Sequence, residues 1–324
     1  MKKYMKQVII LAIFILLPLV FNFNRSFMTL LNMAGIYVVI AIGFNILLGY
    51  AGQISLGHAA FVGIGAYTTA ILSTKCNLSF ILIIPIVILI SGILGFILGL
   101  PALRLQGNYL AIATLGFGVA FSHIFMEWES VTGGFSGIKG INPPNLFGYQ
   151  FKTRLSMYYF ILFFIVVSII FAKNLIKTKT GRALMAIRDS EYAAMSLGID
   201  VAKYKTIAFL ISAIYAGVAG SLYAFLFRQV YPNTFDVGMS LNILAMIVIG
   251  GIASIEGSVV GALFITLIPE FLKNIKVQNA SFILTGLLLI LCVMYFPYGL
   301  VDIYRRFKVW LKKKAAVKDE GVKV

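Results

Sequence analysis

Few side chains in this sequence of 324 residues have a type and spacing that could do acid–base, nucleophilic or metal chemistry. Cys76 and Cys292 lie far apart, and no histidine stands at metal-ligand spacing from either of them. His123 precedes Glu127 by four residues, which is the spacing of an ordinary pair on one helix face. A phosphate loop of the form GxxxxGKS or GxxxxGKT is absent from the sequence. We therefore expect no enzyme activity, no metal or cofactor site, and no ATP bound by this chain itself.

Hydrogen bonding to a passing solute is the chemistry that two glycine-rich segments could perform. The first break, at 49–67, reads GYAGQISLGHAAFVGIGAY and holds too many glycines for a helix of its own propensity. We expect an irregular or re-entrant stretch over 50–57 and a helix that resumes near His58. The second break, at 250–257, reads GGIASIEG. Because NILLGYAGQIS and NILAMIVIGGIAS share an Asn-Ile-Leu start, a Gly-rich break and a serine, we predict a pseudo-repeat of the kind that surrounds a transport pathway.

The pathway hypothesis rests on polar side chains that could hydrogen-bond a solute at membrane depth. They are Asn45, Gln53, Ser55, His58, Tyr109, Thr114 and Asn242. The alternative is that small residues at the breaks only let helices pack closely, and that His58 makes a structural hydrogen bond. Carboxylates at this depth are scarce, with Glu256 in the second break and Glu270 near the end of a later helix. This scarcity weakens the case for a proton- or sodium-coupled carrier.

A charged segment, TKTGRALMAIRDSEYAAMSLGID at 178–200, lies between long apolar runs and is called the island below. It has good helix formers, and Gly198 can end the helix. Small side chains at Ala193 and Ala194 would allow close approach by another protein. We expect a rigid helical lever over 181–198 that docks a partner. The alternative is a solvated loop helix that lies on anionic lipid.

The composition indicates that these segments are positioned in a membrane. The chain is 60% hydrophobic and 12% charged, with a mean hydropathy of +0.97, whereas soluble domains carry about 25% charged residues. Several runs approach the roughly 20 apolar residues that cross a bilayer core. We predict an all-α polytopic bundle, a single transmembrane domain over 1–324 with about ten transmembrane helices. The predicted spans are 8–20, 30–48, 58–72, 80–100, 109–126, 155–172, 207–227, 241–249, 259–272 and 282–295.

The placement of basic residues predicts the orientation of the bundle. The net charge is +16, but Lys and Arg fall at the ends of apolar runs rather than in one patch, which argues against nucleic acid as a partner. Of the 27 basic residues, 19 belong to segments that alternation of the spans places in the cytoplasm. We therefore expect cytoplasmic N- and C-termini, a cytoplasmic loop over 173–205 and a basic cytoplasmic tail over 303–324.

Five motifs in order resemble one family of membrane proteins. They are GYAGQISLGHAAFVGIGAY, LPALRLQGNYLAIATLGFG, TGGFSGI, TGRALMAIRDSEYAAMSLGIDVAKYK and LNILAMIVIGG. Together they resemble the M-type (LivM-like) permease subunit of branched-chain amino acid ABC importers. Two departures are an extra residue, Tyr192, in the E-A-A-x-x-x-G pattern, and Ala253 and Ser258 where the family has glycine.

The resemblance implies a subunit of the bacterial inner membrane that works with several partners. These are a second permease subunit, two cytoplasmic ATPases that bind ATP and Mg²⁺, an extracytoplasmic substrate-binding protein and membrane lipid. It also implies that the island couples to the ATPases through Gly181, Arg182, Ala183, Arg188, Glu191, Ala193, Ala194 and Gly198. The function implied is alternating-access import of a branched-chain or similar small amino acid or amide. The alternative is a secondary carrier or channel for a small neutral solute such as urea.

Overall fold

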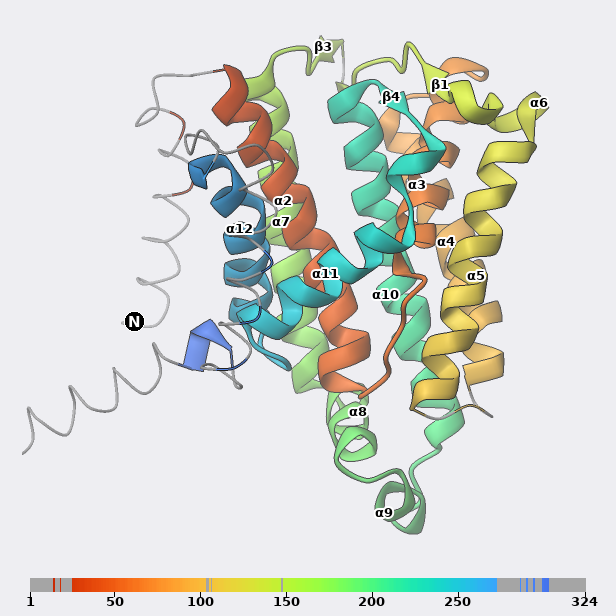
Figure 1. The fold of residues 1–324 in the computed structure, drawn as a ribbon, viewed down its shortest axis with the longest axis vertical. Helices are drawn as coiled ribbons and strands as arrows, with labels where there is room; N and C mark the ends of the chain where they lie inside the picture. Colours follow the sequence, from red (N-terminus) through yellow and green to blue (C-terminus); the bar gives the residue numbers. More distant parts are fainter. Residues whose placement is uncertain are drawn as a thin grey trace, which may run out of the picture.

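The computed structural model describes residues 25–102, 105, 107–146, 148–272 and 299–302, with isolated positions at 14, 18, 286, 290 and 294. The fold is an all-α membrane bundle (Figure 1). Its long helices are α2 (Arg25–Asn45), which continues as the π-helix η1 (Ile46–Tyr50), α3 (His58–Thr74), α4 (Phe80–Ala102), α5 (Asn108–Glu127), α7 (Arg154–Lys177), α10 (Val201–Phe227), α11 (Val237–Gly250) and α12 (Ile255–Leu272).

Short elements connect the long helices at the two ends of the bundle. They are α6 (Glu129–Thr132), α8 (Lys179–Asp189), α9 (Glu191–Ser196), η2 (Gly134–Ser136), η3 (Pro232–Thr234), β1 (Ile138–Lys139), β2 (Asn145–Leu146), β3 (Tyr149–Gln150) and β4 (Gln229–Val230). β1 pairs antiparallel with β4, and β2 pairs antiparallel with β3. Figure 1 places α8 and α9 at one end and the strands with α6 at the other. The two predicted sides of the membrane therefore correspond to opposite ends of the fold.

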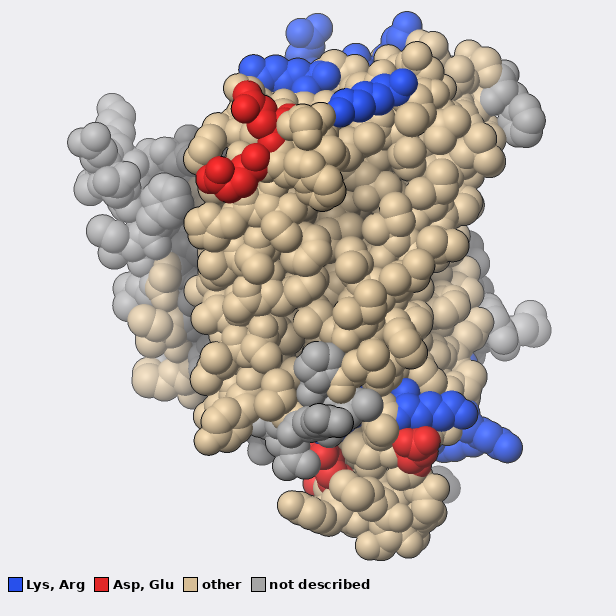
Figure 2. Space-filling view, turned by 90° about the vertical axis from the view of Figure 1, so that its right-hand side faces the viewer, with Lys and Arg blue, Asp and Glu red and all other residues tan. Residues whose placement is uncertain are grey.

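Six helical segments among the described residues are long and apolar enough to cross a membrane. They are α2 with η1, α4, α5, α7, α10, and η3 with α11. Figure 2 shows a broad belt free of Lys, Arg, Asp and Glu between two charged rims, as a membrane-embedded surface requires. α3 and α12, which match the predicted spans 58–72 and 259–272, are not among the six. The predicted spans 8–20 and 282–295 lie almost wholly outside the described residues, so the count of about ten helices remains a prediction.

α10 is the central helix of the bundle, and glycines allow it to pack closely against α3. A Cβ atom at Gly65 would overlap the carbonyl oxygen of Gly217, and one at Gly220 would overlap that of Val62. Glycine is therefore required where the two backbones meet. Large apolar side chains from α2, α3 and α10, including Phe44, Phe61 and Phe209, are almost fully buried around this contact.

Side-chain caps set the starts of several helices. Asp236 Oδ1 accepts a hydrogen bond from Met239 N at 2.8 Å at the start of α11, and Asp200 Oδ1 accepts one from Lys203 N at 3.0 Å at the start of α10. Such caps satisfy backbone N–H groups that have no partner within the helix. Helix start points therefore follow from the local sequence.

The prediction of one rigid helix across the island is wrong. α8 ends at Asp189, and Ser190 is extended, with φ −164° and ψ 114°. Its hydroxyl oxygen accepts a hydrogen bond from Ala193 N at 3.3 Å and so caps a second helix, α9. Serine competes with the backbone for such bonds and is favoured at a helix start over a helix interior. The island is thus a pair of helices joined at Ser190.

Candidate functional site

The first break begins where the π-helix η1 unwinds. Ala51 N donates to Ile46 O at 3.2 Å, and Gly52 N donates to Leu48 O at 3.1 Å. These bonds end the π-helix. Gly52 has a φ of +69°, a conformation that glycine adopts at little cost. From there the chain runs without regular structure to Gly57, and α3 begins at His58. The expected irregular stretch and the restart of the helix are both present.

Polar side chains in the first break are buried in the bundle without hydrogen-bond partners. Gln53 is 3% exposed and Ser55 is 1% exposed. Neither the Gln53 amide nor the Ser55 hydroxyl has a hydrogen-bond partner among the described residues. Burial of a polar group without a partner costs about 1–3 kcal/mol. Such groups are the strongest local sign that this segment binds something polar that enters the bundle.

His58 lies at the start of α3, enclosed by α2 and α10. Its Nε2 and the Ser212 Oγ are 3.3 Å apart, and its ring stacks on Phe44 with the ring centroids 4.5 Å apart. Its Nδ1 has no partner within the described part of the chain. Nε2 therefore has the structural hydrogen bond that was one of the two expectations for His58, and Nδ1 has none among the residues described.

Thr114 on α5 fastens the first break to its neighbour. Its Oγ1 accepts a hydrogen bond from Leu56 N at 3.0 Å and donates to Ala111 O at 3.0 Å. A Cβ at Gly57 would overlap the carbonyl oxygen of Thr114, so only glycine fits there. The structure thus places this predicted pathway residue at the edge of the break, with its hydroxyl already engaged.

Asn45 joins the first break to the second. Its Nδ2 donates to Ser254 O at 2.9 Å and to Ser258 Oγ at 2.7 Å, and its Oδ1 accepts from Ala253 N at 3.0 Å. The loop it holds lies between α11 and α12, and Ala253 there has a φ of +57°. The structure therefore brings into contact the two segments that the sequence paired.

Tyr109 and Asn242 lie apart from this buried cluster. Tyr109, in the first turn of α5, is 74% exposed. Asn242 is exposed on α11, whereas its counterpart in the sequence pairing, Asn45, is 1% exposed. The two asparagines are therefore not equivalent in position, and the pseudo-repeat remains a prediction.

The island has an inner face that packs on the bundle. Gly181 packs against the backbone of Ile176 so closely that a Cβ there would overlap it, and Ala183 and Ala194 are 7% and 1% exposed. Arg182 Nη1 donates to Lys177 O at 2.9 Å. Ala194 is therefore covered by its own chain, whereas Ala193 and Gly198 are exposed.

Two ionic contacts join elements at the end of the bundle that holds the island. Glu191 Oε1 lies 2.5 Å from Nζ of Lys205, whose side chain is only 3% exposed. Lys173 Nζ at the end of α7 lies 3.1 Å from Glu256 Oε1 in the first turn of α12. Glu191, chosen from the sequence as a docking residue, therefore also compensates a buried lysine within this chain.

The outer face of the island carries an apolar tip that sequence reasoning missed. Tyr192, Met195 and Leu197 are 77%, 49% and 79% exposed. Large apolar side chains clustered at the exposed end of a protruding element mark an interaction surface. In the sequence Tyr192 looked like an insertion, and only the separate helix α9 turns these side chains outward.

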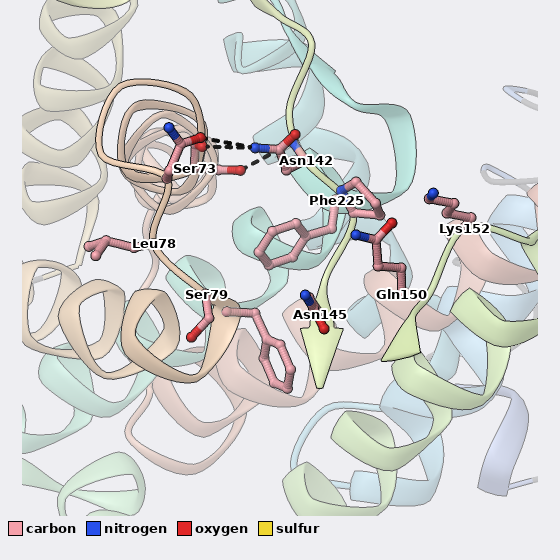
Figure 3. A pocket seen from close by; sticks show the side chains of 11 residues that line it. Ser73, Leu78, Ser79, Asn142, Asn145, Gln150, Lys152 and Phe225 are labelled. Atoms are coloured by element: carbon pink, nitrogen blue, oxygen red, sulfur yellow. Dashed lines mark hydrogen bonds between the residues drawn. The ribbon is translucent and has the colours of Figure 1, made fainter. Parts of the chain in front are cut away.

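The opposite end of the bundle holds a polar pocket of about 440 Å³ (Figure 3). Amide side chains of Asn77, Asn142, Asn145 and Gln150 line it, and Asn142 Nδ2 donates to Ser73 O at 3.3 Å. No group of three or more His, Cys, Asp or Glu side chains that could hold a metal ion occurs among the described residues. The pocket lining thus combines neutral hydrogen-bonding groups with one basic side chain, Lys152.

The chain is similar to known permeases along most of its length. Residues 26–293 match the family described as branched-chain amino acid transport system / permease component. The high-affinity branched-chain amino acid transport system permease protein LivM of Salmonella typhimurium is 33% identical over 308 residues, which cover 88% of this chain and 72% of the relative. LivM of Escherichia coli K12 is 32% identical over 325 residues, with 93% and 76% covered.

The permease named LivH is a second kind of relative. The probable LivH of Methanocaldococcus jannaschii is 25% identical over 292 residues, which cover 83% of this chain and 90% of the relative. No solved structure matches the chain. The family match extends over far more than half of the sequence, and the LivM relatives exceed 30% identity across most of both chains. The chain therefore belongs to the branched-chain amino acid transport permease family.

Proposed function

We propose that this chain is the transmembrane permease subunit of an ATP-driven importer for branched-chain amino acids or a similar small amino acid or amide. The observation that carries the proposal is the first break, where Gln53, Ser55 and His58 present unpartnered polar atoms inside the bundle. A polar solute that crosses the bilayer needs such partners to replace water. The family's relatives are named as branched-chain amino acid permeases, which fits this requirement.

The pathway in this proposal passes the first break. Gln53, Ser55 and His58 contact the solute, whereas Asn45 and Thr114 hold the backbone of the break in place. Tyr109 and Asn242 are exposed on α5 and α11, two helices that touch each other. They therefore belong to a surface that is completed by another chain.

A second permease subunit is the partner for this surface. α5 is the least buried of the six candidate spans, because only 17% of the residues in its most apolar 18-residue stretch are buried. Its exposed face carries small and polar residues, Gly116, Ala120 and His123, among the large aliphatic side chains of Ile112, Val119 and Ile124. Small and polar residues favour helix–helix contact in a membrane. Relatives named LivM and LivH indicate a system with two permeases, and LivH is the kind of chain that fits here.

The ATPases dock on the island. Its apolar tip inserts into the ATPase surface, and Arg182, Glu191, Ala193 and Gly198 surround the tip, while Gly181, Ala183 and Ala194 fix the island to the bundle. ATP and Mg²⁺ bind only to these partners, and this chain needs no cofactor. The substrate-binding protein docks at the opposite end, near the strands and the polar pocket. The chain lies in the bacterial inner membrane with both termini in the cytoplasm.

The experiment is reconstitution in proteoliposomes. The chain is purified with the LivH-type permease, ATPases and binding protein of its own organism, and uptake of radiolabelled L-leucine is measured with and without ATP. We expect uptake to need ATP. Uptake that proceeds equally without ATP would instead mean a carrier or channel.

The matched pair of variants is Leu197→Asp and Leu146→Asp. Each adds one charge at an exposed leucine, the first at the island tip and the second on β2 at the other end. Leu197→Asp should abolish co-purification of the ATPases and ATP-driven uptake, because a charge cannot be buried in an apolar contact. Leu146→Asp should leave the ATPases bound. Equal ATPase recovery for the two variants would refute docking at the tip.

A further inference from the structure

Arg188, near the end of α8, contacts the first break directly. Its Nη1 donates to the Gly49 carbonyl oxygen at 3.1 Å. Gly49 lies in the last turn of η1, where carbonyl groups lack helix partners and a nearby cation is favourable. A Cβ at Gly52 would lie 3.1 Å from Arg188 Cγ and 3.4 Å from its Cα. Both the guanidinium and the aliphatic part of Arg188, called its stem below, therefore lie against the first break.

Asp189 fixes the other side of the guanidinium. Nε and Nη2 of Arg188 both donate to Asp189 Oδ1, at 3.1 and 2.8 Å. The guanidinium is planar, so bonds to the carboxylate determine where Nη1 points. Asp189 is the last residue of α8. The arginine thus bridges the end of α8 and the end of η1, and a displacement of either end changes this bridge.

Gly49 in turn lies against the second break. A Cβ built on Gly49 would overlap Asn45 Oδ1 and would lie 2.5 Å from Ala253 N. The same Oδ1 accepts the hydrogen bond from Ala253 N at 3.0 Å. Contacts therefore run without a gap from α8 through Gly49 and Asn45 to the loop between α11 and α12.

We propose that Arg188 is the positioning residue that links the ATPase-docking island to both breaks, an inference that rests on the proposed function. When an ATPase displaces α8, the guanidinium and its stem move Gly49 and Gly52, and the Asn45 amide moves the loop at Ala253. Contiguous packed and hydrogen-bonded groups are a physical means by which two sites can be coupled. Arg188 acts through a backbone carbonyl and touches neither solute nor nucleotide.

The test measures leucine moved per ATP hydrolysed by the full reconstituted complex. Arg188→Gln should leave ATPase co-purification at the wild-type level and lower this ratio about tenfold, within the usual range of coupling between sites. Arg188→Lys keeps the charge but lacks the planar fork whose separate nitrogens bond the carbonyl and Asp189, so its ratio should be intermediate. Lys179→Gln, which removes one charge from the exposed first turn of the same helix, is the matched control and should keep the wild-type ratio.

A second variant disturbs the same contact from the opposite side. Gly52→Ala places a methyl group against the aliphatic part of Arg188 and puts a non-glycine residue at a φ of +69°, and both effects should lower the ratio without loss of ATPase. A double variant, Arg188→Gln with Asn45→Ala, tests whether the two residues act in one series of contacts. If they do, the double variant should lose no more coupling than the worse single one, because changes at linked sites are not additive.

Each outcome decides the role of Arg188. A wild-type ratio of leucine to ATP in Arg188→Gln overturns the positioning role. Loss of the ATPases to the extent seen in Leu197→Asp also overturns it, because Arg188 would then be a docking residue. In both cases ATP-driven uptake by the unmodified complex leaves the proposed function standing. Uptake by the unmodified complex that needs no ATP overturns the proposed function and this role together.

Discussion

Among individual residues, Ser55 and Gln53 are unusual because their polar atoms are buried in the bundle and unpartnered within the described chain. Tyr67 OH and Ser91 Oγ are also unpartnered there, whereas other buried hydroxyls have local partners. Thr69 Oγ1, for example, donates to Gly65 O at 2.8 Å and to Ser221 Oγ at 2.6 Å. In the proposed transport function, the Ser55 hydroxyl and the Gln53 amide hydrogen-bond the solute.

Ser55→Ala should raise the apparent KM for leucine about tenfold, which corresponds to loss of about 1.4 kcal/mol of binding. The reason is that the solute loses a hydrogen bond while the folded chain loses none. Thermal stability should therefore stay unchanged. Uptake kinetics in proteoliposomes and thermal unfolding in detergent measure the two effects.

Ser221→Ala is the matched control for that variant. It removes an equally buried hydroxyl that Thr69 already partners, so stability should fall slightly while KM stays the same. If Ser55→Ala shows the same pattern as the control, the first break does not contact the solute.

The position of the first break could be predicted from the sequence, but the surroundings of its side chains could not. Glycine content and spacing were enough to place the irregular stretch before His58. Whether a polar side chain faces the interior depends on how helices distant in sequence pack, which explains why Gln53 is buried while Tyr109 is exposed. Thr114 likewise has a role that depends on a backbone N–H 58 positions away.

At the scale of elements, the division of the island at Ser190 gives its two helices different side-chain contacts, while both lie against α10. α8 contacts the end of η1 through Arg188, whereas α9 is held on the start of α10 by Glu191 and Lys205. Lys205 is nearly fully buried, so its charge depends on the carboxylate. Loss of one partner of a buried ion pair leaves a charge without compensation.

Glu191→Ala should therefore destabilise the purified chain by about 3 kcal/mol, the lower end of the range for a broken buried pair. The double variant Glu191→Ala with Lys205→Met removes both charges and should recover most of this loss. Thermal unfolding in detergent compares the two, with Asp189→Ala, on an exposed ion pair, as the control that changes stability little. A double variant no more stable than the single one would show that the carboxylate does not serve Lys205.

Local sequence predicted most helices because apolar runs and glycine breaks act over a few residues. The split island was not predicted, since its helix formers continue across the break and one capping serine decides the outcome. The two ionic contacts are also invisible in the sequence, because Glu256 and Lys173 are far apart along the chain.

At the scale of the whole molecule, the uneven exposure of the spans indicates an assembly. In the most apolar 18-residue stretch of α10, 78% of the residues are buried, as expected of a central helix, whereas in that of α5 only 17% are buried. On α5, Gly116 has no neighbouring atom within 4 Å of a Cβ built on it. Lipid does not require a glycine at such a position, but a closely packed second helix does.

Gly116→Leu should leave the thermal stability of the isolated chain unchanged, because the added side chain meets open space. It should lower co-purification of the second permease several-fold, because it blocks close helix contact. Val167→Trp adds bulk to the exposed face of α7 and serves as the control that keeps the second permease bound. Equal recovery of the partner with both variants would place the permease interface elsewhere than on α5.

The division of the island at Ser190 also separates the proposed ATPase-docking tip from the residues that contact the first break. Tyr192, Met195 and Leu197 form the exposed tip, whereas Arg188, Glu191 and the buried Ala194 hold the two helices to the bundle. A chimera that exchanges only these three tip residues for those of a related permease keeps the contacts of Arg188, Glu191 and Ala194. In the proposed function, specificity for one ATPase can thus diverge or be engineered without any change in the residues that line the breaks.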